Sequence, residues 1–207
     1  MIQSPHTIPY HWLEESDYAA IWQKLQQRAE QIAHQQQQEV IWSCEHDPIY
    51  TTGRRALDNR LHDTLPAPWI ITDRGGETTF HGPGQIMLYP IIDLRRRGIT
   101  VRQYIHLLEQ ATLQLLQQYN IQAERQCNMP GVWVGERKIA AMGVRVARGV
   151  AYHGMALNLS VDLRYFQAIN PCGLGREAIN FNALCSTPFS PKAVAKTWAH
   201  ELITLLS

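Results

Sequence analysis

The residues with the clearest chemical potential in this chain are a cysteine and a lysine. Cys172 lies between a proline and a glycine in the segment NPCGLG, residues 170–175, and Lys138 opens the apolar run KIAAMGVRVA after a turn. A free thiol has a pKa of about 8.5, and a nearby cation lowers it and increases the thiolate fraction. If the fold brings the two side chains together, they form an activated nucleophile. If it does not, Lys138 is a solvated turn lysine.

Two other roles for Cys172 are disfavoured by the rest of the sequence. The remaining cysteines are Cys44, Cys127 and Cys185, and none of the four forms a CxxC pair or clusters with histidines at the spacing of zinc ligands. The first twelve residues, MIQSPHTIPYHW, lack the basic start and apolar stretch of a signal peptide. We therefore expect a cytoplasmic protein, in which disulfides are rare, and no metal site.

A glycine-rich segment, DRGGETTFHGPGQ at residues 73–85, is the second candidate site. Its four glycines are Gly75, Gly76, Gly82 and Gly84. Glycine permits positive φ and close approach of a bound molecule to the backbone, so the segment could line a groove; a pair of tight hairpin turns is the alternative. It is not a phosphate-binding P-loop, because the terminal Lys-Ser/Thr is missing and a strand follows it.

Small residues on two later strands could leave room for an apolar ligand. AAMG at 140–143 and HGMAL at 153–157 are the segments concerned, although close sheet packing explains small residues equally well. His81 and His153 each lie among glycines, and a lone histidine is more often structural than catalytic. Candidate walls that would set the depth of such a slot are Met142 and Met155.

These residues must be positioned by the surrounding helices and strands. Apolar residues at helical spacing predict three helices, which begin near Ser16 or Asp17, after Thr100, and at Pro191. Strand-like runs lie between the helices, several of them joined by short turns such as GER and RG, which favours hairpins over alternating strand–helix units. The predicted fold class is α+β, a mostly antiparallel sheet with helices on one side, in a single domain spanning residues 1–207.

Composition excludes several classes of protein. The chain has 207 residues, 45% hydrophobic and 18% charged, with a net charge of +1. Such a balance gives no reason to expect a nucleic-acid partner, and there is no apolar run long enough to span a membrane. Local basic patches remain, and one hypothesis is a docking face for an acidic protein formed by six arginines: Arg54, Arg55, Arg60, Arg95, Arg96 and Arg97.

Four collinear motifs make the sequence resemble the lipoyl(octanoyl) transferase family. The motifs are RGGETTFHGPGQIMLYPIIDL, KIAAMGVRV, VAYHGMALNLSVDL and NPCGLG, and the resemblance spans roughly residues 15–200. It implies the fold shared by biotin and lipoate ligases. It also implies transfer of an octanoyl group from acyl carrier protein to a specific lysine of a lipoyl domain, through a cysteine thioester and without ATP or another cofactor.

The resemblance also assigns roles to individual residues. Cys172 would be the nucleophile, and Lys138 the cation that lowers its pKa. The acyl group and its thioester would lie against a pocket with three parts: Arg74, Gly75, Gly76, Glu77, Thr78, Thr79, Phe80 and His81; Ala141, Met142 and Gly143; and Gly154, Met155 and Ala156. The stretches IMLY and GLGREAINFNAL vary from the family pattern, so no roles are carried over to them.

The implied partners are acyl carrier protein and the lipoyl domains of 2-oxoacid dehydrogenase E2 subunits and of the glycine cleavage H protein. Two alternatives stay open at the level of sequence. One is an ATP-dependent lipoate or biotin ligase on the same fold, which needs no cysteine nucleophile. The other is a catalytically silent protein that binds acyl carriers without becoming acylated.

Overall fold

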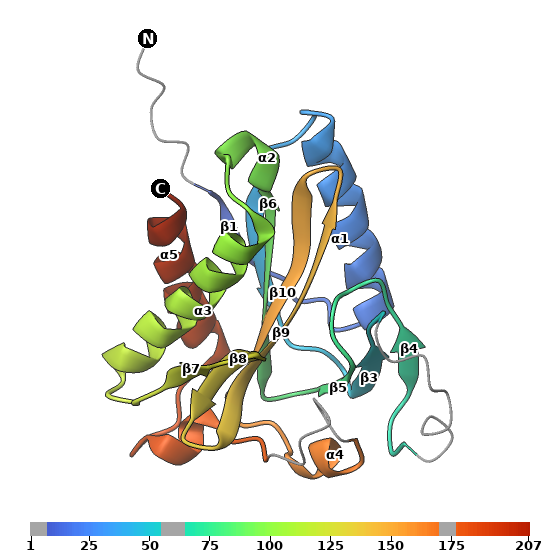
Figure 1. Ribbon diagram of the computed structural model, residues 1–207. Coiled ribbons are helices and arrows are strands. Elements are labelled where there is room, and N and C mark those ends of the chain that lie inside the picture. Colours follow the sequence, from blue (N-terminus) through green and yellow to red (C-terminus); the bar gives the residue numbers. More distant parts are fainter. Residues whose placement is uncertain (1–7, 55–64, 170–176) are drawn as a thin grey trace.

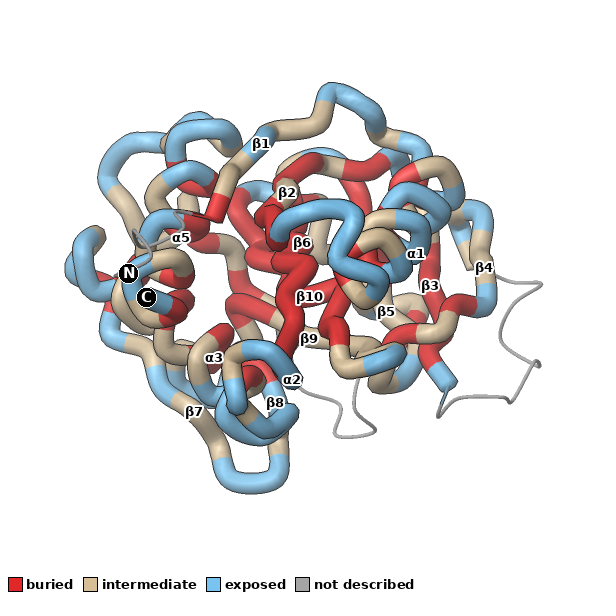
Figure 2. The backbone as a smooth tube through the Cα atoms, turned by 90° about the horizontal axis from the view of Figure 1, so that it is seen from above, coloured by how far each residue is buried: buried red, intermediate tan, exposed pale blue. Residues whose placement is uncertain are grey.

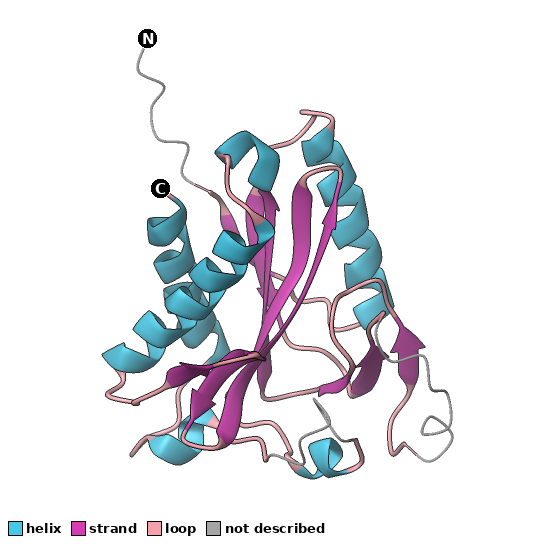
Figure 3. Cartoon of the chain, in the orientation of Figure 1, coloured by secondary structure: helices cyan, strands magenta, loops and turns pink. Residues whose placement is uncertain are grey.

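The computed structural model describes residues 8–54, 65–169 and 177–207, and Figure 1 shows their arrangement. Helices and strands alternate irregularly along the chain, and Figure 3 distinguishes them by colour. The strands are β1 (Tyr10–Trp12), β2 (Val40–Cys44), β3 (Ile49–Thr52), β4 (Trp69–Ile71), β5 (Thr78–His81), β6 (Gln85–Asp93), β7 (Glu124–Gln126), β8 (Met129–Val134), β9 (Arg137–Ala147) and β10 (Val150–Asn158). The helices are α1 (Tyr18–Ala33), α2 (Leu94–Arg97), α3 (Val101–Gln118), α4 (Arg164–Gln167), the 3₁₀ turn η3 (Phe181–Leu184) and α5 (Pro191–Leu206).

Seven strands form the main sheet, in the order β1-β2-β6-β10-β9-β8-β7. All neighbouring pairs are antiparallel except β1 with β2, which is parallel. A second sheet of three strands, in the order β4-β3-β5, lies beside it. The sequence prediction of a mostly antiparallel α+β fold is therefore confirmed, and both long hairpin strands of the predicted pocket, β9 and β10, are neighbours.

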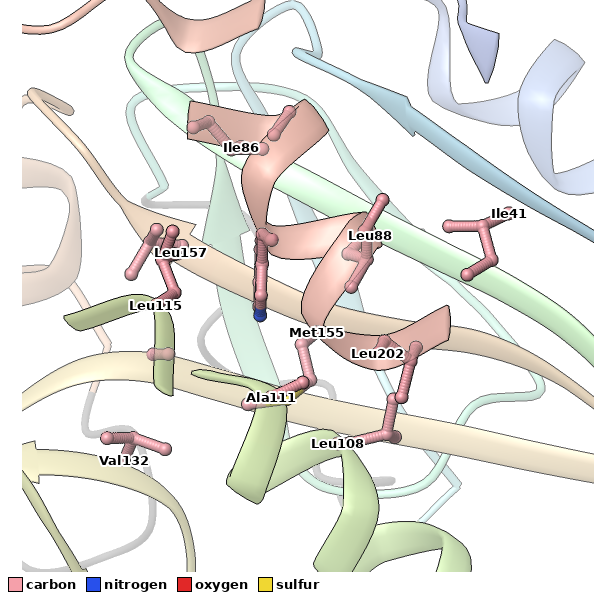
Figure 4. Packing of buried hydrophobic residues seen from close by; sticks show 14 of the residues in the cluster. Ile41, Ile86, Leu88, Leu108, Ala111, Leu115, Val132, Met155, Leu157 and Leu202 are labelled. Carbon is pink, nitrogen blue, oxygen red and sulfur yellow. The ribbon is translucent and has the colours of Figure 1, made fainter. Parts of the chain in front are cut away.

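The helices cover both faces of the main sheet. All nine residues of β6 are buried, and Figure 2 shows β6 and β10 as a buried centre. On β6, Ile86 and Leu88 belong to the core under α3 and α5, part of which is drawn in Figure 4, whereas Met87 and Tyr89 belong to the core under α1. The expectation that helices gather on one side holds for α3 and α5 but is wrong for α1, because β6 is buried at every position and both of its faces need cover.

The helix boundaries follow the capping residues expected from the sequence. The Asp17 carboxylate accepts a hydrogen bond from the Ala20 N–H, and Thr100 and Gln103 form a capping box at the start of α3. Pro191 begins α5, where its missing N–H costs no helical hydrogen bond. No helix in the described part of the chain is long and apolar enough to cross a bilayer.

The glycine-rich segment contains a strand that the sequence did not reveal. Residues 78–81 form β5, which pairs with β3 in the small sheet, and the following turn leads directly into β6. Gly84 has φ +84° in this turn, and a Cβ there would lie 2.6 Å from the carbonyl oxygen of Ser160. Glycine is thus required at Gly84 by both backbone conformation and space.

Candidate active site

A cavity of about 590 Å³ lies between the glycine-rich segment, β9 and β10. Its volume is in the range of pockets that bind small molecules. The sequence-predicted residues that line it are Arg74, Gly75, Gly76, Glu77, Thr78, Thr79, His81, Lys138, Ala141, Met142, Gly143, Gly154, Met155 and Ala156. Phe80 does not line it: this side chain is buried in a separate core, where its ring stacks on Tyr165 at 4.2 Å. The three predicted stretches, far apart in sequence, thus surround one space.

The RGG segment lies directly on β9. The Gly75 N–H donates to the Val144 carbonyl oxygen at 3.1 Å, which pairs the segment with β9 beyond the point where β8 ends. A Cβ at Gly143 would lie 2.9 Å from the Gly75 carbonyl oxygen and 3.0 Å from Cδ of Arg74. Gly143 is therefore needed for close packing of this segment on the strand, in addition to the room it leaves in the pocket.

Arg74 holds this segment together from inside. Its side chain is only 6% exposed, and its guanidinium donates to the Thr51 hydroxyl and carbonyl oxygens and to the Gly75 and Glu77 carbonyl oxygens. Every one of these acceptors is a neutral oxygen. Burial accordingly lowers the pKa of Arg74 from its ordinary value. The result is a buried positive centre at the wall of an otherwise largely apolar pocket.

Asp73, the residue before Arg74, is a hydrogen-bond hub that the sequence analysis missed. Its carboxylate accepts from Trp22 Nε1 at 2.8 Å, from His153 Nε2 at 2.8 Å and from the Tyr152 hydroxyl. Burial raises the pKa of Asp73, but these hydrogen bonds outweigh it and hold the pKa well below its usual range. The charged hub fastens the start of the RGG segment to α1 and β10.

Backbone conformation explains how two successive residues of β10 reach the same carboxylate. In a regular strand, neighbouring side chains point to opposite faces. His153 has φ +58°, and its ring lies 5.1 Å from that of Tyr152, so both side chains turn toward Asp73. The positive φ is a strained conformation for a residue with a side chain, and it is held by the Asp73 contact.

We expect Asp73→Asn to lower the free energy of unfolding by about 1–3 kcal/mol, because an amide cannot accept from three donors as a carboxylate does. The folded-state pKa of Asp73 is depressed, so its stabilising contribution is present above the unfolded pKa of about 3.9 and is lost as pH falls through the folded value. Urea unfolding at pH 7 measures the effect. Asp162→Asn, at an exposed ion pair, is the matched control and should leave the midpoint unchanged.

Lys138 lies at the other end of the pocket. Its ammonium nitrogen is 4.6 Å from the ring centroid of Trp133, its partner on β8. The Lys138 N–H donates to the Glu177 carbonyl oxygen at 2.9 Å, and its own carbonyl oxygen accepts from the Ile179 N–H at 3.0 Å. Lys138 is therefore not a solvated turn lysine: it is half-buried, stacked on a tryptophan, and its main chain is paired with segment 177–179.

Cys172 lies outside the described residues, and its predicted contact with Lys138 stays a prediction. Both ends of the segment that contains it are described. Ile169 is buried in the small core with Phe80, and Glu177 is hydrogen-bonded to Lys138. Phe166, three residues before Ile169, and Glu177 both line the pocket.

His46 and His81 are both buried and hydrogen-bonded, and His81 also lines the pocket. His46 Nε2 lies 2.7 Å from the Tyr89 hydroxyl, and His81 Nδ1 lies 2.7 Å from Gln85 Oε1. Burial lowers the pKa of His46 to about 4 and puts the pKa of His81 well below its ordinary value. Both rings are therefore neutral at physiological pH, and the assignment of His81 to the acyl pocket stays a prediction.

We expect the protein to lose stability as pH falls from 6.5 toward 4. Folded His46 and His81 bind fewer protons than the unfolded chain in this window, so unfolding is favoured as pH decreases. From the value for His46, the loss between pH 7.5 and pH 5 is about 2 kcal/mol for that residue. Urea unfolding at the two pH values measures it. His46→Gln should flatten the dependence, and His200→Gln, an exposed control on α5, should not.

The arginines of the predicted docking face differ in their contacts. Arg54 lines the pocket, whereas Arg96 and Arg97 lie at the opposite end of β6, where both bind Glu39. Arg55 and Arg60 lie outside the described residues. Arg96 and Arg97 thus share an ion pair with Glu39, and the docking face formed by the six arginines stays a prediction.

The fold and pocket define an α+β protein with a site for a small molecule, and comparison with known proteins identifies the family. The model of the lipoyl protein ligase A/B catalytic domain matches residues 17–203. The octanoyltransferase of Shewanella sp. (strain W3-18-1) is 39% identical over 86% of this chain and 82% of its own length. The octanoyltransferase of Xanthomonas axonopodis pv. citri (strain 306) is 43% identical over 78% of this chain and 69% of its own length. The chain therefore belongs to the lipoyl protein ligase A/B catalytic-domain family. It is an acyltransferase, and its relatives support octanoyl transfer in protein lipoylation.

Solved structures agree on the fold. The bipartite lipoate protein ligase of Thermoplasma acidophilum superposes with a TM-score of 0.70 at 15% identity, covering 97% of this chain and 84% of that one. Biotin protein ligase from Aquifex aeolicus, in complex with biotin and ATP, gives a TM-score of 0.62 at 11% identity, covering 96% and 70%. The biotin/lipoate ligase-like fold implied by the sequence motifs is confirmed.

Proposed function

We propose that this enzyme transfers an octanoyl group from acyl carrier protein to a lysine of a lipoyl domain, through a thioester on Cys172 and without ATP. The observation that carries the proposal is the pairing of segment 177–179 with Lys138 at the pocket. Cys172 is five residues from Glu177 and three from Ile169, so the chain limits its distance from those two anchors to about 18 Å and about 11 Å. Glu177 lines the pocket, and so does Phe166, three residues before Ile169, so the described residues on both sides of Cys172 adjoin the space that Lys138 also lines.

The chemistry proceeds in two balanced steps. The Cys172 thiolate attacks the thioester carbonyl of the octanoyl carrier, the tetrahedral intermediate collapses, and the pantetheine leaves as a thiol, protonated by the Lys138 ammonium, which becomes a neutral amine. The amine of the incoming lysine then attacks the acyl-enzyme, loses a proton, and releases the Cys172 thiolate as the amide forms. Exchange between thioesters is nearly isoenergetic and amide formation is downhill, so neither step needs nucleotide activation.

Lys138 suits both steps. As an ammonium it favours the thiolate in the first step, and its position over the Trp133 ring places the charge against an apolar, electron-rich surface. In the second step its neutral amine accepts the proton of the attacking lysine as a general base. The buried guanidinium of Arg74 adds positive potential at the same pocket, on the side of the RGG segment.

An intact-mass measurement tests the proposal directly. The protein mixed with octanoyl-loaded acyl carrier protein should gain the mass of one octanoyl group, and subsequent addition of a lipoyl domain should move that mass to the domain. Cys172→Ser separates a thioester from carried-over ligand. Transfer from free octanoate that requires ATP and survives Cys172→Ala would support the ligase alternative instead. Binding of the carrier with no mass gain would support the silent acyl-binding protein.

Chain-length preference is expected to depend on Met142 and Met155, which are direct partners on β9 and β10 and both line the pocket. Met155 is only 1% exposed, and the Thr112 hydroxyl donates to its sulfur at 3.4 Å. Each buried methylene contributes about 0.8 kcal/mol, or roughly fourfold in affinity. Met142→Ala should therefore raise kcat/KM for decanoyl over octanoyl carrier by about tenfold. Met129→Ala, which does not line the pocket, is the control, and an unchanged ratio in Met142→Ala would contradict the assignment.

The proposed partners are the acyl carrier protein and lipoyl domains such as those of 2-oxoacid dehydrogenase E2 subunits and the glycine cleavage H protein, in the cytoplasm. In support, the structure of the Thermoplasma acidophilum relative includes an E2 lipoyl domain. The described residues contain no group of three or more His, Cys, Asp or Glu side chains placed to hold a metal ion. The expectation that neither a metal nor another cofactor takes part stays a prediction.

A further inference from the structure

A chain of buried hydrogen bonds leads away from Arg74. The guanidinium donates from Nε and Nη2 to the Thr51 hydroxyl oxygen, at 3.0 and 2.9 Å. The Thr51 hydroxyl lies 3.1 Å from His81 Nε2, and His81 Nδ1 lies 2.7 Å from Gln85 Oε1. All four side chains are at most 6% exposed, so water does not compete for these contacts.

The chain continues toward β9. Gln85 Nε2 donates to Asn158 Oδ1 at 2.9 Å, and Asn158 Nδ2 donates to the carbonyl oxygen of Lys138 at 3.5 Å, the longest contact in the series. Gln85 and Asn158 are opposite each other on β6 and β10. They are 1% and 5% exposed. We call Thr51, His81, Gln85 and Asn158 the amide relay.

The donor and the acceptor of each hydrogen bond in the amide relay follow from Arg74 at one end and from the hydrogen bond between Gln85 and Asn158 toward the other. An arginine can only donate, so the Thr51 oxygen accepts and its own proton goes to His81 Nε2. Because Gln85 donates from Nε2 to Asn158, its Oε1 must accept, and His81 Nδ1 carries the proton. In every hydrogen bond of the series, the donor therefore lies on the Arg74 side and the acceptor on the Lys138 side. Hydrogen bonds aligned in this way strengthen one another.

The relay ends at a fork in the sheet. The pairing of β9 with β10 stops at Ala140 and Leu157, and two residues earlier on β9 Lys138 pairs with Ala178 instead. Asn158, the next residue of β10, bridges this gap with its side chain. A carbonyl oxygen has two lone pairs, and that of Lys138 accepts one hydrogen bond from Ile179 and the other from Asn158.

We propose that Gln85 and Asn158 are positioning residues for Lys138: through the amide relay they link the Arg74 wall of the pocket to the main chain of Lys138 and fix the direction in which its ammonium points. The catalytic consequence rests on the proposed function, because it requires Lys138 to act on an acyl-enzyme. The positional consequence does not, and can be measured without any reaction.

The position of Lys138 is read from the NMR signals of its side chain. The chain has only four lysines, Lys24, Lys138, Lys192 and Lys196, so protein labelled with ¹³C-lysine gives few Cε signals. The Lys138 signal, assigned by its loss in Lys138→Arg, should be displaced by the Trp133 ring beneath it. Asn158→Ala and Gln85→Ala should shift it toward the exposed lysines. An unmoved signal in both folded variants would overturn the proposal, whether or not the enzyme transfers octanoyl groups.

Kinetics give the second measurement. Asn158→Ala should lower kcat for octanoyl transfer by about 10- to 100-fold, because a displacement near 1 Å has effects of that order, while KM for the octanoyl carrier changes less than about threefold. Asn158→Asp keeps the size of the side chain but removes the N–H donor, and it should lower kcat as Asn158→Ala does.

Glu39→Gln is the control: it weakens a buried polar cluster at the far end of β6 and should leave kcat unchanged. A rise in KM at constant kcat would overturn the proposal by making Asn158 a substrate contact. Absence of transfer in the wild type would reject the proposed function, and the NMR result would then decide the positioning alone.

Discussion

Cys172→Ala is expected to lower the rate of octanoyl transfer by at least about 10³-fold, because a covalent intermediate splits one difficult acyl transfer into two easier steps. The variant should bind octanoyl carrier protein but gain no octanoyl mass. Intact-mass spectrometry and a lipoyl-domain acylation assay measure the two effects. The retained binding distinguishes a lost nucleophile from a lost fold.

The other thiols provide the control for this experiment. Cys127 is exposed and Cys44 is fully buried, where burial raises the pKa of its thiol. Cys127→Ala should therefore be acylated and should transfer at the wild-type rate. Full activity in Cys172→Ala, or acyl mass found on Cys127, would contradict the assignment of the nucleophile.

Lys138→Ala is expected to reduce acyl-enzyme formation by about 10²- to 10⁴-fold at neutral pH, the range in which positioned acid–base groups act. The loss should diminish as pH rises, because without a neighbouring ammonium the thiol returns toward its ordinary pKa of about 8.5. Rapid-quench measurement of both half-reactions between pH 6 and pH 9.5 tests this. Lys192→Ala, an exposed ion-pair lysine on α5, is the control.

Lys138→Arg separates the two proposed roles of the lysine. A guanidinium keeps the positive charge but does not lose a proton at physiological pH, so it can favour the thiolate without acting as a base. Acyl-enzyme should therefore form and accumulate, and its transfer to the lipoyl domain should be slow. Equal loss in both half-reactions would show that arginine does not fit over Trp133, and loss in neither would exclude general-base action by Lys138.

Much of the architecture was determined by local sequence patterns. Helix starts at Asp17, Thr100 and Pro191 were predictable because capping depends on residues within one turn. The long hairpin strands β9 and β10 and their small residues were also predictable, since alternating β-formers joined by a two-residue turn leave few alternatives. The position of α1 on the second face of the sheet was not, because an amphipathic helix shows which of its own faces is apolar but not which side of a sheet it covers.

The residues of the candidate site likewise fall into those that the sequence revealed and those that only the fold revealed. The residue types that could do chemistry, Cys172 and Lys138, and the glycines that leave room for a ligand were visible in the sequence, because each has an unusual local setting. Asp73, Gln85 and Asn158 were not, since an aspartate or a side-chain amide is unremarkable until its partners are known. Those partners come from three or four separate elements, and their hydrogen bonds have meaning only where the fold removes water. Thus the sequence by itself determined which groups are available, and only the tertiary structure decided which of them are buried together, oriented and charged.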